Sequence, residues 1–152
     1  MGADIKGTIE VMMNGEWRFY KRIAPPRWYT AIAKLTNRRN APMGHECHVQ
    51  PYKENTGIPE DATKETMEII NRYGCERHSH TTYSLEELEE VFKQPITRRL
   101  LDEETGERDW YTEYVTPKNV FGECGNDIMS KYRGPRAIPG CEDVRVIIWI
   151  DN

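Results

Sequence analysis

The sequence predicts an α+β protein in which an antiparallel sheet carries about three helices on one face. Three observations lead to this class: a β-hairpin pattern near the N-terminus, amphipathic helical patterns in the middle, and an apolar run before the C-terminus. With 152 residues the chain has the length of one ordinary domain. No linker or repeat divides it, so we expect 1–152 to form a single domain.

The N-terminal hairpin is predicted over residues 5–23. Apolar residues alternate on both sides of Asn14-Gly15, a dipeptide that suits the two positive-φ positions of a tight primed turn. After Pro25 and Pro26, the stretch WYTAIAKL has apolar residues at helical spacing. Residues 37–60 have no sustained periodicity, and such a long irregular segment is often functional.

Two further helices are predicted in the middle of the chain. The first lies in EDATKETMEIINRYG, with Gly74 as its C-terminal stop. The second begins at a capping box formed by Ser84 and Glu87 and ends before Pro95. The segment CERHSHTT is then expected to be the connection between these helices. DWYTEYV and DVRVIIWI are predicted to be the middle and C-terminal strands of the sheet.

Composition excludes several classes of protein. The formal net charge of −4 disfavours bulk binding of nucleic acid, and no apolar run is long enough to span a bilayer. The polar N-terminus does not resemble a signal peptide, so we expect a cytoplasmic location. The four cysteines are spread singly, without the paired spacing of a zinc module, and are expected to be buried thiols.

The histidine and cysteine residues allow a metal site as one hypothesis. HECH and CERHSH would supply enough ligands for a tetrahedral zinc if the two segments met. The ligands would be His45, Cys47, Cys75 and His78. Their spacing does not match a structural zinc module, so we predict no metal and no other cofactor.

Catalysis is a second hypothesis. His78 and His80 resemble one copy of the paired histidine motifs with which some phosphodiesterases take and give a proton. A separate second copy is missing from the sequence.

Anion binding is the third hypothesis, and it uses arginines in an otherwise acidic protein. The guanidinium group binds phosphate through two parallel hydrogen bonds, aromatic rings stack on bases, and donors before a helix N-terminus favour phosphate. The candidate contacts are Trp28, Arg38, Asn40, Arg77, His78, Ser79, Thr81 and Arg133.

Four segments, MGADIKGTIEV, GIPED, HSHTTYSLEEL and DVRVIIWIDN, are similar to motifs of a family of small bacteriophage and prophage proteins. That family has the pattern MGxDIH, GLPED, GHSxSWLTLxEL and VRxxFWFDN. Matching positions include Asp4, Asp61, His78 and Ser79, whereas Lys6 stands where the family has histidine. The resemblance implies a phage-encoded accessory protein, a group that often includes inhibitors of bacterial immunity.

Together these observations predict a phage anti-defence protein in the cytoplasm of the host. We expect it to bind and sequester a small phosphorylated, nucleotide-derived signal without turnover. Two alternatives stay open: a histidine- or metal-dependent phosphoesterase that degrades such a signal, and an inhibitor that docks on a host protein through residues 37–60. The sequence is compatible with a homo-oligomer, because small sequestering proteins commonly share pockets between subunits.

Overall fold

The computed structural model describes residues 3–38, 49–72, 77–122 and 138–151, with the backbone alone described for 98–101. Its main sheet has four strands in the order β2-β1-β6-β3, and every neighbouring pair is antiparallel. These strands are β1 (Asp4–Met13), β2 (Glu16–Ile23), β3 (Arg77–Ser84) and β6 (Cys141–Asp151). The predicted hairpin is confirmed, because Asn14 and Gly15 have φ angles of 51° and 77° between β1 and β2.

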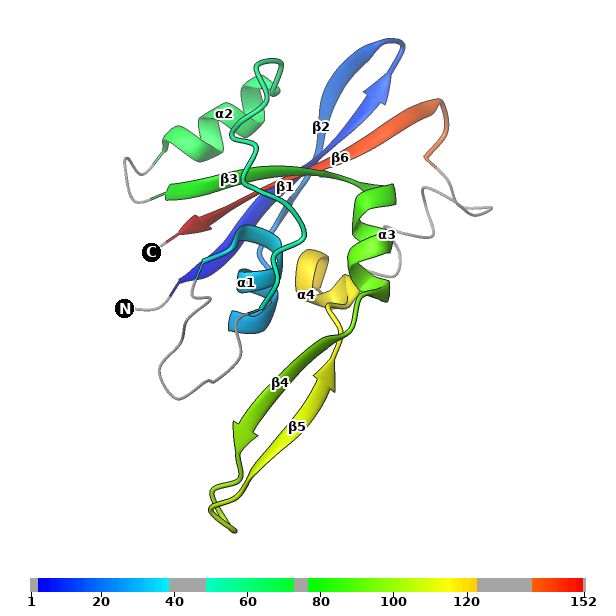
Figure 1. Ribbon diagram of the computed structural model, residues 1–152. Coiled ribbons are helices and arrows are strands. Elements are labelled where there is room, and N and C mark those ends of the chain that lie inside the picture. The colour runs from blue at the N-terminus through cyan, green and yellow to red at the C-terminus, as the bar shows by residue number, and fades with distance from the viewer. Residues whose placement is uncertain (1–2, 39–48, 73–76, 123–137, 152) are drawn as a thin grey trace.

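Helices cover both faces of this sheet (Figure 1). One face, called the α1 face, packs under α1 (Tyr29–Thr36), α3 (Leu85–Lys93) and α4 (Pro117–Phe121). The other, called the α2 face, packs under α2 (Lys64–Asn71). The expectation that helices cover a single face is therefore wrong. Strand β6 explains the difference, because Ile148 and Ile150 belong to the core of the α1 face and Ile147 and Trp149 to that of the α2 face.

The α+β class is confirmed, but the middle strand of the sheet is not the predicted one. DWYTEYV contributes β5 (Arg108–Glu113), which pairs with β4 (Ile96–Leu101) in a separate two-stranded sheet. This β4–β5 arm projects from the body of the molecule (Figure 1). The fourth strand of the main sheet is β3, so the expectation that its histidines lie in a loop between helices is wrong. Thr81, Thr82 and Tyr83 favour a strand, because β-branched and aromatic residues suit a half-buried pleated surface.

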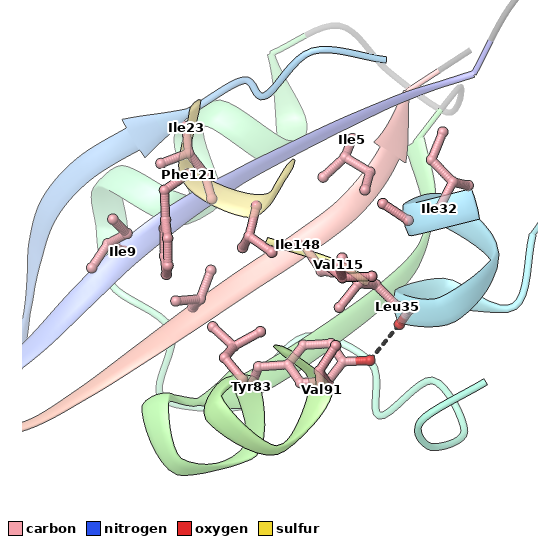
Figure 2. Close-up of a cluster of buried hydrophobic side chains, with 14 of the residues drawn as sticks. Ile5, Ile9, Ile23, Ile32, Leu35, Tyr83, Val91, Val115, Phe121 and Ile148 are labelled. Carbon is pink, nitrogen blue, oxygen red and sulfur yellow. Dashed lines mark hydrogen bonds between the residues drawn. The ribbon is translucent and has the colours of Figure 1, made fainter. Parts of the chain in front are cut away.

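In the core of the α1 face, α1 packs against β3 and α3 (Figure 2). The Tyr83 hydroxyl, which is fully buried, donates a hydrogen bond of 2.5 Å to the carbonyl oxygen of Leu35 at the end of α1. That carbonyl has no partner within the helix, so the tyrosine satisfies it. The predicted capping box of Ser84 and Glu87 is confirmed at the start of α3. Among the described residues, no helix has both the length and the apolar run needed to cross a membrane.

Residues 49–63, which lead into α2, pass from one face to the other over the free edge of β3 (Figure 1). Lys53 Nζ donates to the carbonyl of Thr82 at 2.5 Å and to Glu87 at 2.7 Å. Thr56 then accepts from the Thr82 amide, and the Gly57 amide donates to the His80 carbonyl at 2.8 Å. These bonds satisfy backbone groups that β3 would otherwise expose as an edge strand. In the described part of 37–60 no helix or strand forms, as predicted.

A buried ionic network fixes α2 to the other face. Glu10 is fully buried, and one of its oxygens accepts from Arg145 Nε at 2.8 Å. The other oxygen accepts from the Thr63 amide and the Thr66 hydroxyl at the N-terminus of α2. Arg145 also donates to Asp61 at 2.8 Å. Burial by itself would raise the pKa of Glu10, but the bonds from Thr63, Thr66 and Arg145 hold it below the ordinary value of 4.5.

Replacing the carboxylate in this network tests its contribution. In Glu10→Gln, the side of the Arg145 guanidinium that contacts residue 10 is buried without a counter-charge. We expect the free energy of unfolding to fall by about 3 kcal/mol. Asp61→Asn is the matched control, since the Asp61 side chain is 67% exposed and should cost less than about 1 kcal/mol. Urea denaturation of both variants measures the difference, and equal losses would contradict the assignment.

The same network predicts a dependence on pH. Because the folded pKa of Glu10 lies below its ordinary value, the unfolded chain binds this proton first as pH falls. Its contribution is therefore complete above about pH 4.5 and is lost as pH falls through the folded pKa. The stability of Glu10→Gln should fall less steeply than that of the wild type over this acid range.

Candidate functional site

The candidate site lies at a β-bulge in β3. His78 pairs with Ile150 and Thr81 pairs with Ile148, so two residues, Ser79 and His80, stand opposite the single residue Trp149. Ser79 has a φ of 60°, in the left-handed region that non-glycine residues rarely adopt. Such a conformation costs about 1–3 kcal/mol and persists only where the surroundings enforce it, often at functional sites.

On the α1 face, the bulge brings together three of the predicted ligand contacts. The Ser79 hydroxyl accepts from Arg38 Nε at 2.5 Å and lies 2.9 Å from His78 Nδ1. Arg38 follows the left-handed Asn37 that ends α1, and it is exposed. Among the described residues only its Nε makes a hydrogen bond, and a guanidinium can bind an oxyanion through two parallel N–H groups.

Thr81, a fourth predicted contact, lies beneath the surface of this site and stabilises it. It is fully buried, and its hydroxyl donates to Asn55 Oδ1 at 2.7 Å. The bond ties the crossing segment to the bulge, next to the contacts of Thr56 and Gly57. Thr81 therefore positions the site without presenting its hydroxyl to solvent.

Arg77 and His80 lie on the opposite, α2 face. The guanidinium of Arg77 lies 5.9 Å from the centre of the Trp149 ring, and the His80 ring lies 6.0 Å from it. Burial lowers the pKa of His80 below its ordinary 6.5, and the nearby His78 and Arg77 lower it further. This lowered pKa favours the neutral form of His80. The bulge separates Arg77 from Arg38, although the sequence hypothesis placed both in one site.

The same geometry separates the two histidines of the catalytic hypothesis. His78 pairs with Ile150, whose side chain belongs to the α1 face, whereas His80 packs on Trp149 of the α2 face. A general acid and a general base must both reach one substrate. The two rings do not offer that arrangement on either face of β3.

The other predicted site residues lie elsewhere. Trp28 precedes α1 and packs on the core, so a helix of about 12 Å separates it from Arg38. Asn40 and Arg133 lie outside the described residues, as do His45, Cys47 and Cys75 of the metal hypothesis. Within the described ranges, no group of three or more histidine, cysteine or acidic side chains could hold a metal ion.

Sequence reasoning missed two features that shape the site. Asn55 and Lys53 hold the crossing segment on β3, and they carry no motif that would have identified them. Three hollows of the described surface are also separate from the bulge. One hollow of about 540 Å³ is lined by α2 residues between Lys64 and Arg72 and by no residue of the bulge. The candidate site is thus a partly exposed polar surface at a sheet edge.

No protein-family model, curated protein or solved structure matches this chain. The similarity to small phage proteins accordingly stays a prediction from the sequence motifs. Ligand binding has to be inferred from the geometry of the bulge itself.

Two substitutions at Ser79 test whether its conformation is enforced. Ser79→Ala keeps a Cβ in the left-handed region and removes the hydroxyl, whereas Ser79→Gly removes both. We expect Ser79→Gly to be more stable than Ser79→Ala by about 1 kcal/mol, because glycine adopts positive φ without strain. Thermal or urea unfolding measures this difference. Equal stabilities would show that Ser79 is not held in a strained conformation.

Proposed function

We propose that this protein binds a small phosphorylated ligand at the bulge of β3 and holds it without turnover. The observation that carries the proposal is the contact of Arg38 and His78 with the hydroxyl of Ser79, a residue in a costly backbone conformation. A guanidinium, an imidazole and a hydroxyl at one exposed point provide charge and directional donors for a phosphate.

The bulge supports binding better than hydrolysis. A phosphoesterase that used His78 and His80 would need both rings on one side of the substrate, and they lie on opposite faces of the sheet. A ligand that is held but not cleaved is removed from solution in proportion to the amount of protein. This behaviour is what a sequestering protein requires.

The biological role proposed here comes from the sequence motifs. We propose a phage-encoded protein that acts in the cytoplasm of the host bacterium and sequesters a nucleotide-derived immune signal. Arg38 and Ser79 would bind the phosphate of such a ligand, whereas the predicted aromatic contact Trp28 lies elsewhere. The ligand class follows from the guanidinium and the motifs together.

Arg38→Ala tests the site directly. We expect it to weaken binding of the preferred nucleotide, found in a panel of cyclic and ADP-ribose-type compounds, by about tenfold or more, since a charge-assisted bidentate contact is lost. Stability should fall by less than about 1 kcal/mol, because Arg38 is exposed and loses a single surface hydrogen bond to Ser79. Isothermal titration calorimetry measures both affinity and stoichiometry.

The matched control is Arg22→Ala, which removes the same charge from an exposed position of β2, three strand spacings or about 14 Å across the sheet from β3. Arg22→Ala should bind as the wild type does. If no member of the panel binds, or if both variants lose the same affinity, the proposal fails.

A second function is favoured by the β4–β5 arm. Trp110, Tyr111 and Tyr114 expose 61%, 42% and 48% of their surface there. A two-stranded sheet alone is marginally stable in water, and exposed aromatic residues are typical of protein interfaces. Residues 96–114 carry six acidic and three basic side chains, a net charge of −3. The arm therefore suits a host protein with a basic surface. Residues 49–60 are less suited to docking on a host protein, because they already contact β3 and α1.

Trp110→Ser tests this second function, with Tyr29→Ser as the control because Tyr29 is also an exposed aromatic residue. Wild type and Tyr29→Ser should retain one stoichiometric basic protein from host lysate and reform the complex after purification. Trp110→Ser should lose it while keeping its affinity for nucleotide. Retention by all three proteins, or the absence of a stoichiometric partner, would exclude the arm as a docking element.

A further inference from the structure

Three buried polar atoms without a hydrogen-bond partner among the described residues lie together on the α2 face. They are Trp149 Nε1, His80 Nε2 and Thr82 Oγ1. Native proteins pair the great majority of such atoms, so a local group of three needs a specific explanation. Ordered water or a bound ligand is the usual one.

The register of β3 against β6 places the three residues side by side. His80 stands at the bulge opposite Trp149, with the ring centres 6.0 Å apart. Thr82 pairs with Ile147, the next position of β6 on the same face, which is about 7 Å along the strand. The residues therefore form a continuous patch between the two strands.

The chemistry of the patch favours an acceptor with negative charge. An indole Nε1–H group can only donate, and the neutral imidazole and the hydroxyl can donate as well. Arg77 adds a buried positive charge, since only 8% of this residue is exposed to solvent. Its guanidinium lies over Trp149, and its Nε is 3.8 Å from Asp151. Asp151 therefore forms an ion pair with Arg77 at a distance longer than a hydrogen bond.

We propose that this patch is an oxyanion site, in which a phosphate-class group accepts hydrogen bonds from Trp149, His80 and Thr82 beside the charge of Arg77. His80 and Thr82 are partly exposed as residues, whereas the three donor atoms are themselves buried, so the ion reaches them by displacing side chains at the edge of the sheet. The site is separate from that of Arg38 and Ser79, because it lies on the other face of β3. If experiments exclude binding at one of the two sites, the proposal for the other site still stands.

Nuclear magnetic resonance of the tryptophan indole groups tests the proposal with inorganic phosphate as the probe. The chain has four tryptophans, and Trp149→Phe identifies the Trp149 Nε1–H signal by its disappearance. Phosphate at constant ionic strength should shift this signal in a saturable manner. The signal of Trp110, which is 61% exposed, is the internal reference and should not saturate.

Thr82→Val is the decisive variant, because it replaces an unpartnered buried hydroxyl by a methyl group of the same shape. Its stability should equal or exceed that of the wild type, while its affinity for phosphate should fall about tenfold. Arg38→Ala should leave the Trp149 shift unchanged. An unmoved Trp149 signal would mean that water alone occupies the patch and would overturn the proposal, as would an unchanged affinity in Thr82→Val.

Discussion

The two buried faces of β6 are the constraint on which the rest of the structure depends. A strand that is apolar on both sides must be covered twice, so α1 and α2 lie on opposite faces and the chain between them has to cross the sheet. It crosses at the free edge of β3, where Lys53, Thr56 and Gly57 bind the backbone of that strand. The candidate site lies at this crossing because the crossing holds the bulge in place.

The polar interactions of the molecule divide into those that fix the fold and those that remain available for ligands. Glu10 and Arg145 satisfy each other and anchor α2, and the Tyr83 hydroxyl satisfies the end of α1. Two residues that carry the similarity to phage proteins belong to this structural group, since Asp61 binds Arg145 and Asp4 binds Arg27, each at 2.8 Å. His78 and Ser79 differ from them, because their bonds hold a strained backbone at the surface.

Local signals made part of the fold predictable from the sequence. The Asn14-Gly15 turn and the Ser84 capping box act over a few residues, and the apolar run of β6 needs no partner to be recognised. Strand β3 was missed because its bulge breaks the period of two and its histidines suggested a polar loop. For the same reason, only some of the site residues were predicted correctly. Arg38 meets Ser79 from 41 residues away, and the bulge moves Arg77 to the other face.

The measurement that tests ligand binding at the bulge most directly is a release experiment. The purified protein is incubated with signalling nucleotides and freed of unbound compounds. It is then denatured by heat, and the released material is identified by mass spectrometry. We expect one phosphorylated compound to be returned intact, in an amount stoichiometric with the protein. A cleaved product would make the protein an enzyme, and the absence of any retained compound would contradict ligand binding at the bulge.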